Sequence, residues 1–189
     1  MISRSIRKIL RIALFLFPVA GDAALASPRI EILIRDNPQL VALDSELSAK
    51  LRAALGTPGT DVAKVDQGQR DWLHGRQQCL ANSDPTACLA GQYSRRIAEV
   101  SAGYGLGPAM PPVWFRCDGD PPLGFKITFY KSGVGSLVAE RHGTRVVMVQ
   151  DPTASGIRYS GDGSEFAEHQ GIARIIWPGL PGALRCTSN

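Results

Sequence analysis

A stretch rich in glycine and proline, residues 102–112, separates two parts of the chain that carry different hydrophobic patterns. Before this stretch, apolar residues recur every three or four positions, as on one face of a helix. After it, apolar and polar residues alternate in short runs, as in strands with one buried face. We therefore predict an α+β protein with a helical domain over residues 36–101, a linker over 102–112 and a β domain over 113–189.

Residues 39–101 are predicted to form a helical hairpin or a three-helix module. The first helix presents an apolar face made by Leu40, Leu43, Leu47, Leu51 and Leu55. Thr60 or Asp61 can cap the second helix, and Pro85 can open the third. The apolar seams of these two helices contain Val62, Val65, Gln69, Trp72, Arg76 and Cys79, then Leu89, Tyr93, Ile97 and Val100. Residues 27–38 are predicted to be irregular.

The β domain is predicted to contain six to eight short antiparallel strands, arranged as a barrel or a sandwich. The alternating runs are Val113–Cys117, Phe125–Tyr130, Ser136–Arg141, Thr144–Val149, Glu165–His169, Ile172–Trp177 and Ala183–Cys186. Small residues and glycines interrupt this pattern between Thr153 and Gly171, with a polar turn at 160–164. Side chains from this stretch are therefore predicted to project from loops.

The first 26 residues have the layout of a secretory signal peptide, which is too short to span a membrane. Basic residues precede an apolar run over 12–20 and a small-residue site at Ala24-Leu25-Ala26. No cysteine occurs before Cys79, so no lipid-attachment cysteine stands at the cleavage site. We predict a soluble periplasmic or secreted protein with no stable membrane insertion after cleavage.

Charge and cysteine content restrict the function classes further. Removing the signal peptide removes four basic side chains and one acidic side chain, which takes the formal charge from +4 to +1. No lysine and arginine stripe with interleaved aromatics is left, so nucleic acid is excluded as a partner. No Cys-x-x-Cys pair or closely spaced histidines indicate a metal, and no cofactor is predicted.

Four cysteines in an exported chain suggest two disulfides, for which the sequence alone permits three pairings. Spacing favours Cys79 with Cys88 and Cys117 with Cys186, because each pair then lies within one compositional segment. In the loop-entropy model the shorter bridge contributes about 2.7 kcal/mol and the longer one about 4.4 kcal/mol. Such bridges matter in modules this small, whose hydrophobic cores alone are marginal.

Two motifs near the C-terminus resemble a known family. Ser155-Gly156 is followed after two residues by Tyr159, and a second loop ends at Gly171. With Arg116-Cys117-Asp118-Gly119 and Arg185-Cys186 at the two ends, this pattern resembles the membrane-bound or periplasmic inhibitors of c-type lysozyme. The resemblance covers about Phe115 to Cys186. It implies a small closed barrel whose Ser155 enters the catalytic cleft of lysozyme.

The second loop departs from that family pattern. The family usually has a lysine before the glycine, where this chain has Gln170, and an aromatic residue where it has Ala167 or Glu168. Gln170 donates hydrogen bonds without a charge, which predicts weaker binding or a shifted target. His169, when protonated, or Arg158 can partly replace the missing cation.

The helical part is similar to the N-terminal domain of the LprI-like family, which also includes lysozyme inhibitors. The residues that carry this similarity are Gln69-Arg70-Asp71-Trp72-Leu73, Arg76, Cys79, Cys88-Leu89, Tyr93 and Arg96-Ile97. Trp72 and Tyr93 are interpreted as core aromatics, because both lie on apolar faces.

Catalysis is not predicted. His74, His142 and His169 are scattered, no serine lies in a Gly-x-Ser-x-Gly elbow, and no acid completes a pairing of Ser155 with His169. The glycine spacing in the linker does not indicate a nucleotide loop either, because no helix can open through Pro108.

The predicted function is inhibition of c-type lysozyme, which protects peptidoglycan. A lysozyme cleft holds two catalytic carboxylates, against which Ser155 can place its hydroxyl while Gly156 lets the backbone approach. The predicted lysozyme-binding residues are Ser155, Gly156, Arg158, Tyr159, His169, Gln170 and Gly171, on the Ser155 loop and the loop Glu168–Gly171. The alternative is a non-inhibitory envelope module that recognises glycan or another envelope protein.

Overall fold

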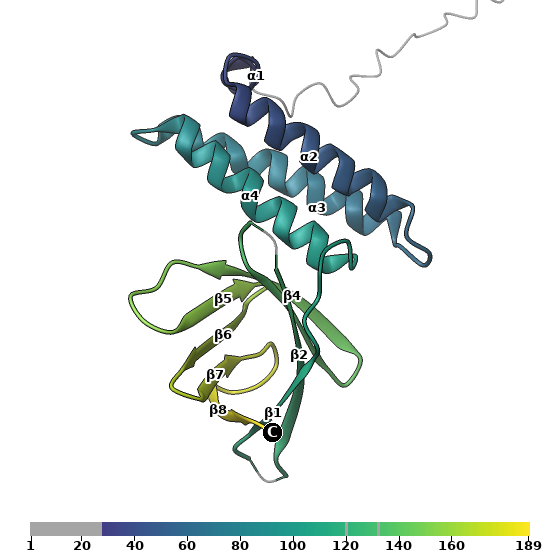
Figure 1. Cartoon of the computed structure of the whole chain (residues 1–189), viewed down its shortest axis with the longest axis vertical. Helices are drawn as coiled ribbons and strands as arrows, with labels where there is room; N and C mark the ends of the chain where they lie inside the picture. The colour runs from purple at the N-terminus through teal and green to yellow at the C-terminus, as the bar shows by residue number, and fades with distance from the viewer. Residues whose placement is uncertain (1–27, 120, 132) are drawn as a thin grey trace, which may run out of the picture.

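The computed structural model describes residues 28–119, 121–131 and 133–189. Helices fill its N-terminal part and a closed β-barrel fills its C-terminal part, with the last and longest helix lying between the other helices and the barrel (Figure 1). This arrangement confirms the predicted α+β class. The predicted signal peptide, residues 1–26, lies outside the described residues.

Four α-helices and one 3₁₀ helix make up the described helical part. They are α1 (Pro28–Arg35), α2 (Pro38–Leu55), α3 (Val62–Gly75), the 3₁₀ helix η1 (Arg76–Ala81) and α4 (Pro85–Gly103). The prediction that residues 27–38 are irregular was wrong for 28–35. Ile30 and Ile34 are four residues apart on one face of α1, and both are buried.

Side-chain caps fix where three of these helices begin. Asn37 accepts hydrogen bonds from the backbone N–H groups of Gln39 and Leu40 at the start of α2. Asp61 accepts one from Lys64, so Asp61 rather than Thr60 caps α3 with its side chain. Pro85 opens α4 as predicted, in the first turn after the cap.

The helical core is built around Tyr93, which is fully buried on α4. Its hydroxyl donates to Asp44 at 2.7 Å and accepts from Arg76 at 2.8 Å, and Arg76 also pairs with Glu31 at 2.8 Å. Burial raises the pKa of the Tyr93 hydroxyl strongly; its hydrogen bond to Asp44 acts in the same direction, and the charge of Arg76 opposes both. Trp72 packs edge-on against its ring, which confirms the interpretation of both aromatics as core residues.

The barrel has eight antiparallel strands, each hydrogen-bonded to the next, and β8 pairs with β1 to close it. The strands are β1 (Val113–Cys117), β2 (Leu123–Tyr130), β3 (Ser136–Arg141), β4 (Thr144–Asp151), β5 (Ile157–Gly161), β6 (Ser164–His169), β7 (Ile172–Ile176) and β8 (Ala183–Ser188). Seven of these correspond to predicted runs. Strand β5 does not, because the stretch from Thr153 to Ser164 was predicted as loop.

Both favoured disulfide pairings are present. Cys79 is bonded to Cys88 between η1 and α4, and Cys117 to Cys186 between β1 and β8. The second pair is in direct register across the strand pair that closes the barrel. It therefore ties the first strand of the sheet to the last.

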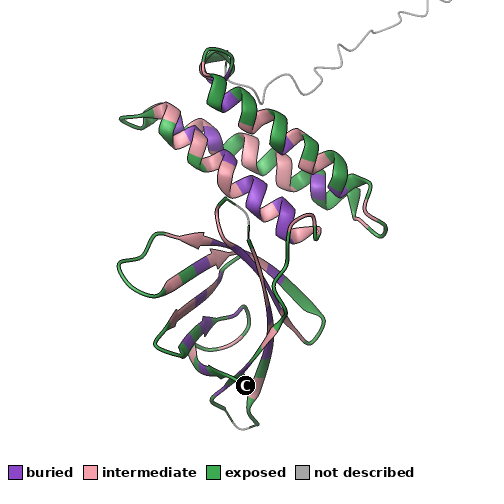
Figure 2. Cartoon of the chain, viewed as in Figure 1, coloured by how far each residue is buried: buried purple, intermediate pink, exposed green. Residues whose placement is uncertain are grey.

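Helix α4 lies across the outer face of β3 and β4. Ala98 and Ala102 on α4, and Val138 and Val149 on β3 and β4, are buried but belong to neither of the two hydrophobic cores. Because α4 contacts β3 and β4, we attribute their burial to packing between helix and barrel, and Figure 2 shows buried positions in the part of α4 nearest the barrel. The small side chains on α4 let the helix approach the sheet closely.

Residues 102–112, which we predicted as a linker, include the end of α4 and a short β-bridge to the end of β2. Residues 102 and 103 are the last of α4. Ala109 forms an isolated bridge with Tyr130, with hydrogen bonds from Met110 N to Phe129 O and from Lys131 N to Pro108 O. The domain boundaries themselves stay a prediction.

No helix in the described part of the chain combines the length and apolar character that a membrane span requires.

Candidate functional site

Two connections at one end of the barrel carry most of the predicted binding residues. The β4–β5 loop, residues 152–156, contains Ser155 and Gly156 and projects from the side of the barrel (Figure 1). The β6–β7 turn is formed by Gln170 and Gly171, between the paired residues His169 and Ile172. In an up-and-down barrel alternate connections lie at the same end, so this loop and this turn share one end of the barrel.

Backbone geometry explains why the β6–β7 turn is so short. Gln170 and Gly171 have φ angles of 52° and 80°, the left-handed pair that a two-residue hairpin turn requires. The backbone N–H of Gly171 also donates to the Glu168 carboxylate at 2.7 Å. The turn therefore presents Gln170 on a fixed backbone, and both residues are exposed.

Gly156 joins the loop to the turn. Its φ is +68°, and a Cβ built on it would lie 2.3 Å from the carbonyl oxygen of Glu168 and 3.2 Å from the Cβ of His169. The end of the β4–β5 loop therefore lies directly against the end of β6. A glycine is needed here for both its φ and its lack of a side chain, and this contact places Gly156 beside His169, the residue before the Gln170 turn.

Ser155 is exposed, and its hydroxyl has no hydrogen-bond partner among the described residues. Its carbonyl accepts a hydrogen bond from the Thr153 hydroxyl at 3.0 Å, which stabilises the bend of the loop. His169 is also exposed and ends β6. The side chains at this end of the barrel are therefore open to a partner, while the backbone that carries them is constrained.

Arg158 and Tyr159 lie in β5 rather than in a loop, which corrects the prediction for both. Arg158 points to the outside of the barrel and pairs with Glu165 at 2.6 Å. Tyr159 points inward, where it is 7% exposed and packs near Phe129 and Phe166. Burial raises the pKa of the Tyr159 hydroxyl. Tyr159 is therefore part of the barrel core, and Arg158 is already engaged by a carboxylate.

Two basic residues near this end were not found from the sequence. Lys131 is exposed and directly follows β2, whose connection to β3 lies at the same end as Ser155. Arg95 on α4 donates to the carboxylate of Asp151 and to the carbonyl of Gln150, both at 2.9 Å. No sequence motif indicates either residue, because their positions depend on strand order and on how the helices dock.

The barrel sequence matches a known family. Residues 115–182 match the family model described as membrane-bound lysozyme-inhibitor of c-type lysozyme. The barrel is similar to these inhibitors. The match spans β1 to β7, with both predicted binding loops, and it confirms the resemblance predicted for the C-terminal part.

Similarity to other proteins also extends over the helices. The chain is 28% identical over 173 residues to Lipoprotein LprI from Mycobacterium bovis and from two strains of Mycobacterium tuberculosis. The alignment covers 89% of this chain and 86% of each relative, so it includes both the helices and the barrel. This supports the predicted LprI-like relationship and, together with the barrel match, a lysozyme-inhibitor-like protein.

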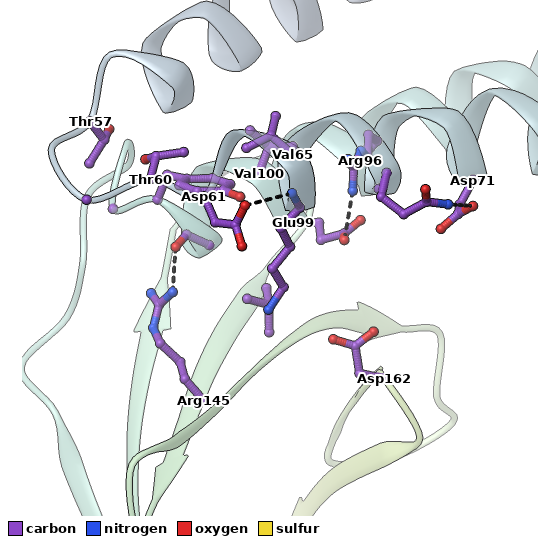
Figure 3. A pocket seen from close by; sticks show the side chains of 18 of the residues that line it. Thr57, Thr60, Asp61, Val65, Asp71, Arg96, Glu99, Val100, Arg145 and Asp162 are labelled. Carbon is purple, nitrogen blue, oxygen red and sulfur yellow. Dashed lines mark hydrogen bonds and ion pairs between the residues drawn. The ribbon is translucent and has the colours of Figure 1, made fainter.

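A separate cleft lies between the helices and the barrel (Figure 3). It has a volume of about 730 Å³ and is lined by polar and apolar groups from the α2–α3 connection, α3, α4 and the barrel. Asp61, Glu99, Arg145 and Asp162 are among them, and Arg96 pairs with Glu99 at 2.8 Å. None of the residues predicted to bind lysozyme lines this cleft.

Proposed function

We propose that this protein inhibits c-type lysozyme in the cell envelope by inserting the Ser155 loop and the Gln170 turn into the catalytic cleft. The observation that carries the proposal is the contact of Gly156 with Glu168 and His169, which holds the loop and the turn side by side. The family match over residues 115–182 supports the choice of target.

The chemistry of the two surfaces is complementary. A lysozyme cleft contains one carboxylic acid with a raised pKa and one ionised carboxylate, and both can accept hydrogen bonds. Ser155 offers an exposed hydroxyl, and the Gln170 amide offers two further donors. Because the loop backbone is tied to β6, little conformational entropy is lost when it binds.

The positive charge that the family places in the second loop comes from other residues in this proposal. Arg158 is paired with Glu165, whereas Lys131 is an exposed cation at this end of the barrel. The protein acts by blocking a cleft and has no catalytic step of its own.

Substitutions in the two loops test the proposal in a cell-wall lysis assay with a c-type lysozyme. Ser155→Ala removes the donor and should weaken inhibition by about 1 to 3 kcal/mol, because the contact is desolvated and charge-assisted. Ser83→Ala, at an exposed serine of the helical part, is the matched control and should change nothing. Gln170→Lys should strengthen inhibition and increase its dependence on salt, whereas Gln170→Glu should weaken it.

The proposal fails if the folded variants Ser155→Ala, Gln170→Lys and Gln170→Glu all inhibit as well as the parent protein. Direct capture of lysozyme by the purified protein separates loss of binding from loss of solubility. The proposal also fails if the parent protein does not inhibit lysozyme at any concentration.

A second candidate function is glycan binding in the cleft of Figure 3, favoured by a lining that combines polar side chains with the half-buried Tyr104. Titration with soluble peptidoglycan fragments tests it. Binding that is lost in Asp61→Ala and Asp162→Ala but kept in Ser155→Ala would assign glycan recognition to the cleft.

A further inference from the structure

Helix α4 is held against the barrel by one arginine at each end of β4. At the start of the strand, Arg145 donates to the carbonyl of Ala102 at 3.1 Å and to that of Gly103, at the C-terminal end of α4. A cation is favourable there because the last carbonyls of a helix carry partial negative charge. At the end of β4, Arg95 reaches from α4 to Gln150 and Asp151. The helix and the strand therefore run alongside each other between two polar contacts.

The two contacts lie at different distances from the candidate site. Arg145 comes directly after the tight β3–β4 turn, far along the strand from that site. Asp151 is the last residue of β4, and the Ser155 loop begins at the next residue. Arg95 therefore holds the backbone at the point where the loop leaves the barrel.

The loop is thus constrained at both ends. Hydrogen bonds from Arg95 to the Gln150 carbonyl and the Asp151 carboxylate add to the β4–β5 pairing at its start, and the approach of Gly156 to Glu168 constrains its end. Within the loop, the described residues show one side-chain hydrogen bond, from Thr153 to the Ser155 carbonyl. Strand pairing holds both flanks as well, Asp151 with Arg158 and Ile157 with Glu168, so loss of the Arg95 contact would loosen the start of the loop without freeing it.

We propose that the helical part serves as a scaffold that orients the inhibitory loop, with Arg95 as the positioning residue. This inference rests on the proposed function, and it gives the helices a role in inhibition without direct contact to the lysozyme carboxylates. Arg95 acts through Asp151 and the Gln150 carbonyl, and Ser155 makes the contact with the target.

The test compares inhibition constants for a c-type lysozyme across a small set of full-length variants. Arg95→Ala should weaken inhibition about three- to tenfold, the effect of a single half-exposed ion pair with an added backbone contact. Arg95→Lys, which keeps the charge, should restore part of the loss. Arg145→Ala removes the contact at the other end of the same helix and should leave inhibition within about twofold of the parent.

A double-mutant cycle separates positioning from a general loss of stability. If Arg95 acts by orienting Ser155, Arg95→Ala should cost little in a protein that already carries Ser155→Ala, so the two effects are strongly non-additive. Hydrogen exchange of the backbone at 153–156 should speed up in Arg95→Ala and stay unchanged in Arg145→Ala. Additive effects, or equal losses in Arg95→Ala and Arg145→Ala, would overturn the inference.

The outcomes also distinguish this inference from the proposed function. If Ser155→Ala has no effect on inhibition, the loop is not the inhibitory surface and both ideas fail. If Ser155→Ala weakens inhibition but Arg95→Ala does not, the proposed function stands and the helical part has no positioning role. Should Arg95→Ala fail to fold, Asp151→Asn removes the carboxylate partner instead, and the same expectations apply to it.

Discussion

Replacement of Gly156 by alanine tests whether contact between the two loops is needed for inhibition. The new Cβ would stand 2.3 Å from the Glu168 carbonyl oxygen, a distance at which the backbone has to move. The Glu168 oxygen belongs to the backbone of β6, so no side chain can rotate away to make room. We therefore expect the β4–β5 loop to shift away from the β6–β7 turn and to carry Ser155 with it.

The free energy of unfolding should fall through two separate effects. Holding alanine at a φ of +68° costs about 1 to 2 kcal/mol, because Cβ crowds the backbone in the left-handed region. Relieving the overlap with Glu168 costs about 1 to 3 kcal/mol more, as other overpacking substitutions do. The expected total is a loss of about 2 to 5 kcal/mol.

Gly163→Ala is the matched control. Gly163 has nearly the same φ, +70°, but a Cβ there would meet no heavy atom within 4 Å. It lies in the β5–β6 turn at the opposite end of the barrel. This variant should lose only the conformational part, about 1 to 2 kcal/mol, and should inhibit lysozyme as the parent protein does.

Urea unfolding and lysozyme inhibition, measured on both variants, test whether contact between the loop and the turn is needed. We expect Gly156→Ala to be less stable than Gly163→Ala by about 1 to 3 kcal/mol and to be the only one of the two with weakened inhibition. Equal stability losses would mean that the loop relaxes without cost. Full inhibition by folded Gly156→Ala would show that the spacing of loop and turn does not matter.

Two further predictions concern the stability of the protein, one through its disulfides and one through Tyr93. The double substitution Cys117→Ala with Cys186→Ala should lower the stability of the barrel by about 4 kcal/mol, and Cys79→Ala with Cys88→Ala should lower that of the helices by about 2.7 kcal/mol. The first loss is larger because that disulfide closes the longer loop. Unfolding followed separately at Trp177 and Trp72 checks this, and a reversed order of losses would contradict it. Because burial raises the pKa of Tyr93 above that of an unfolded tyrosine, its contribution to stability is complete below pH about 10 and declines as the pH rises further. Tyr93→Phe should therefore show a shallower loss of stability above pH about 10 than the parent protein, and an unchanged slope would contradict the assignment; the raised pKa values of Tyr104 and Tyr159 keep some slope in both proteins.

Most of the architecture could be predicted from local signals. The leucine spacing between Leu40 and Leu55, the cap at Asp61 and the opening proline Pro85 are signals from residues close in sequence, and they predict α2, α3 and α4. The alternating apolar and polar runs likewise predict seven of the eight strands. The family resemblance then supplied barrel closure, which depends on pairing between β1 and β8 at opposite ends of the segment.

Three elements were not predicted, namely strand β5, helix α1 and the 3₁₀ helix η1. The 3₁₀ helix was not predicted because Arg76 and Cys79 were placed in the second helix, which ends at Gly75. Strand β5 is short and ends in Ser160 and Gly161, which are typical of turns. Gly161 is required because a Cβ there would lie 2.1 Å from the Val147 carbonyl oxygen, so its glycine marks close approach of two strands. Helix α1 follows the predicted signal peptide closely, and its eight residues carry too few turns for a clear periodicity.

The candidate site was predictable only in part. The Ser155-Gly156 motif identified the first loop, but its proximity to Gln170 depends on barrel register. Arg95 could not be found, because it lies on a helix that precedes the barrel and meets Asp151 only through docking.

The way the helices dock also restricts how a partner can approach. Helix α4 covers an outer face of the closed barrel, at β3 and β4, where Val138 and Val149 are buried. That face is unavailable to lysozyme. The exposed approach to Ser155 is from the end of the barrel, beside Arg95, whose side chain is 38% exposed. In the proposed complex, an enzyme that receives the loop therefore passes close to α4, so bulky substitutions on exposed positions of α4 near Arg95 should reduce association more than similar changes on α2.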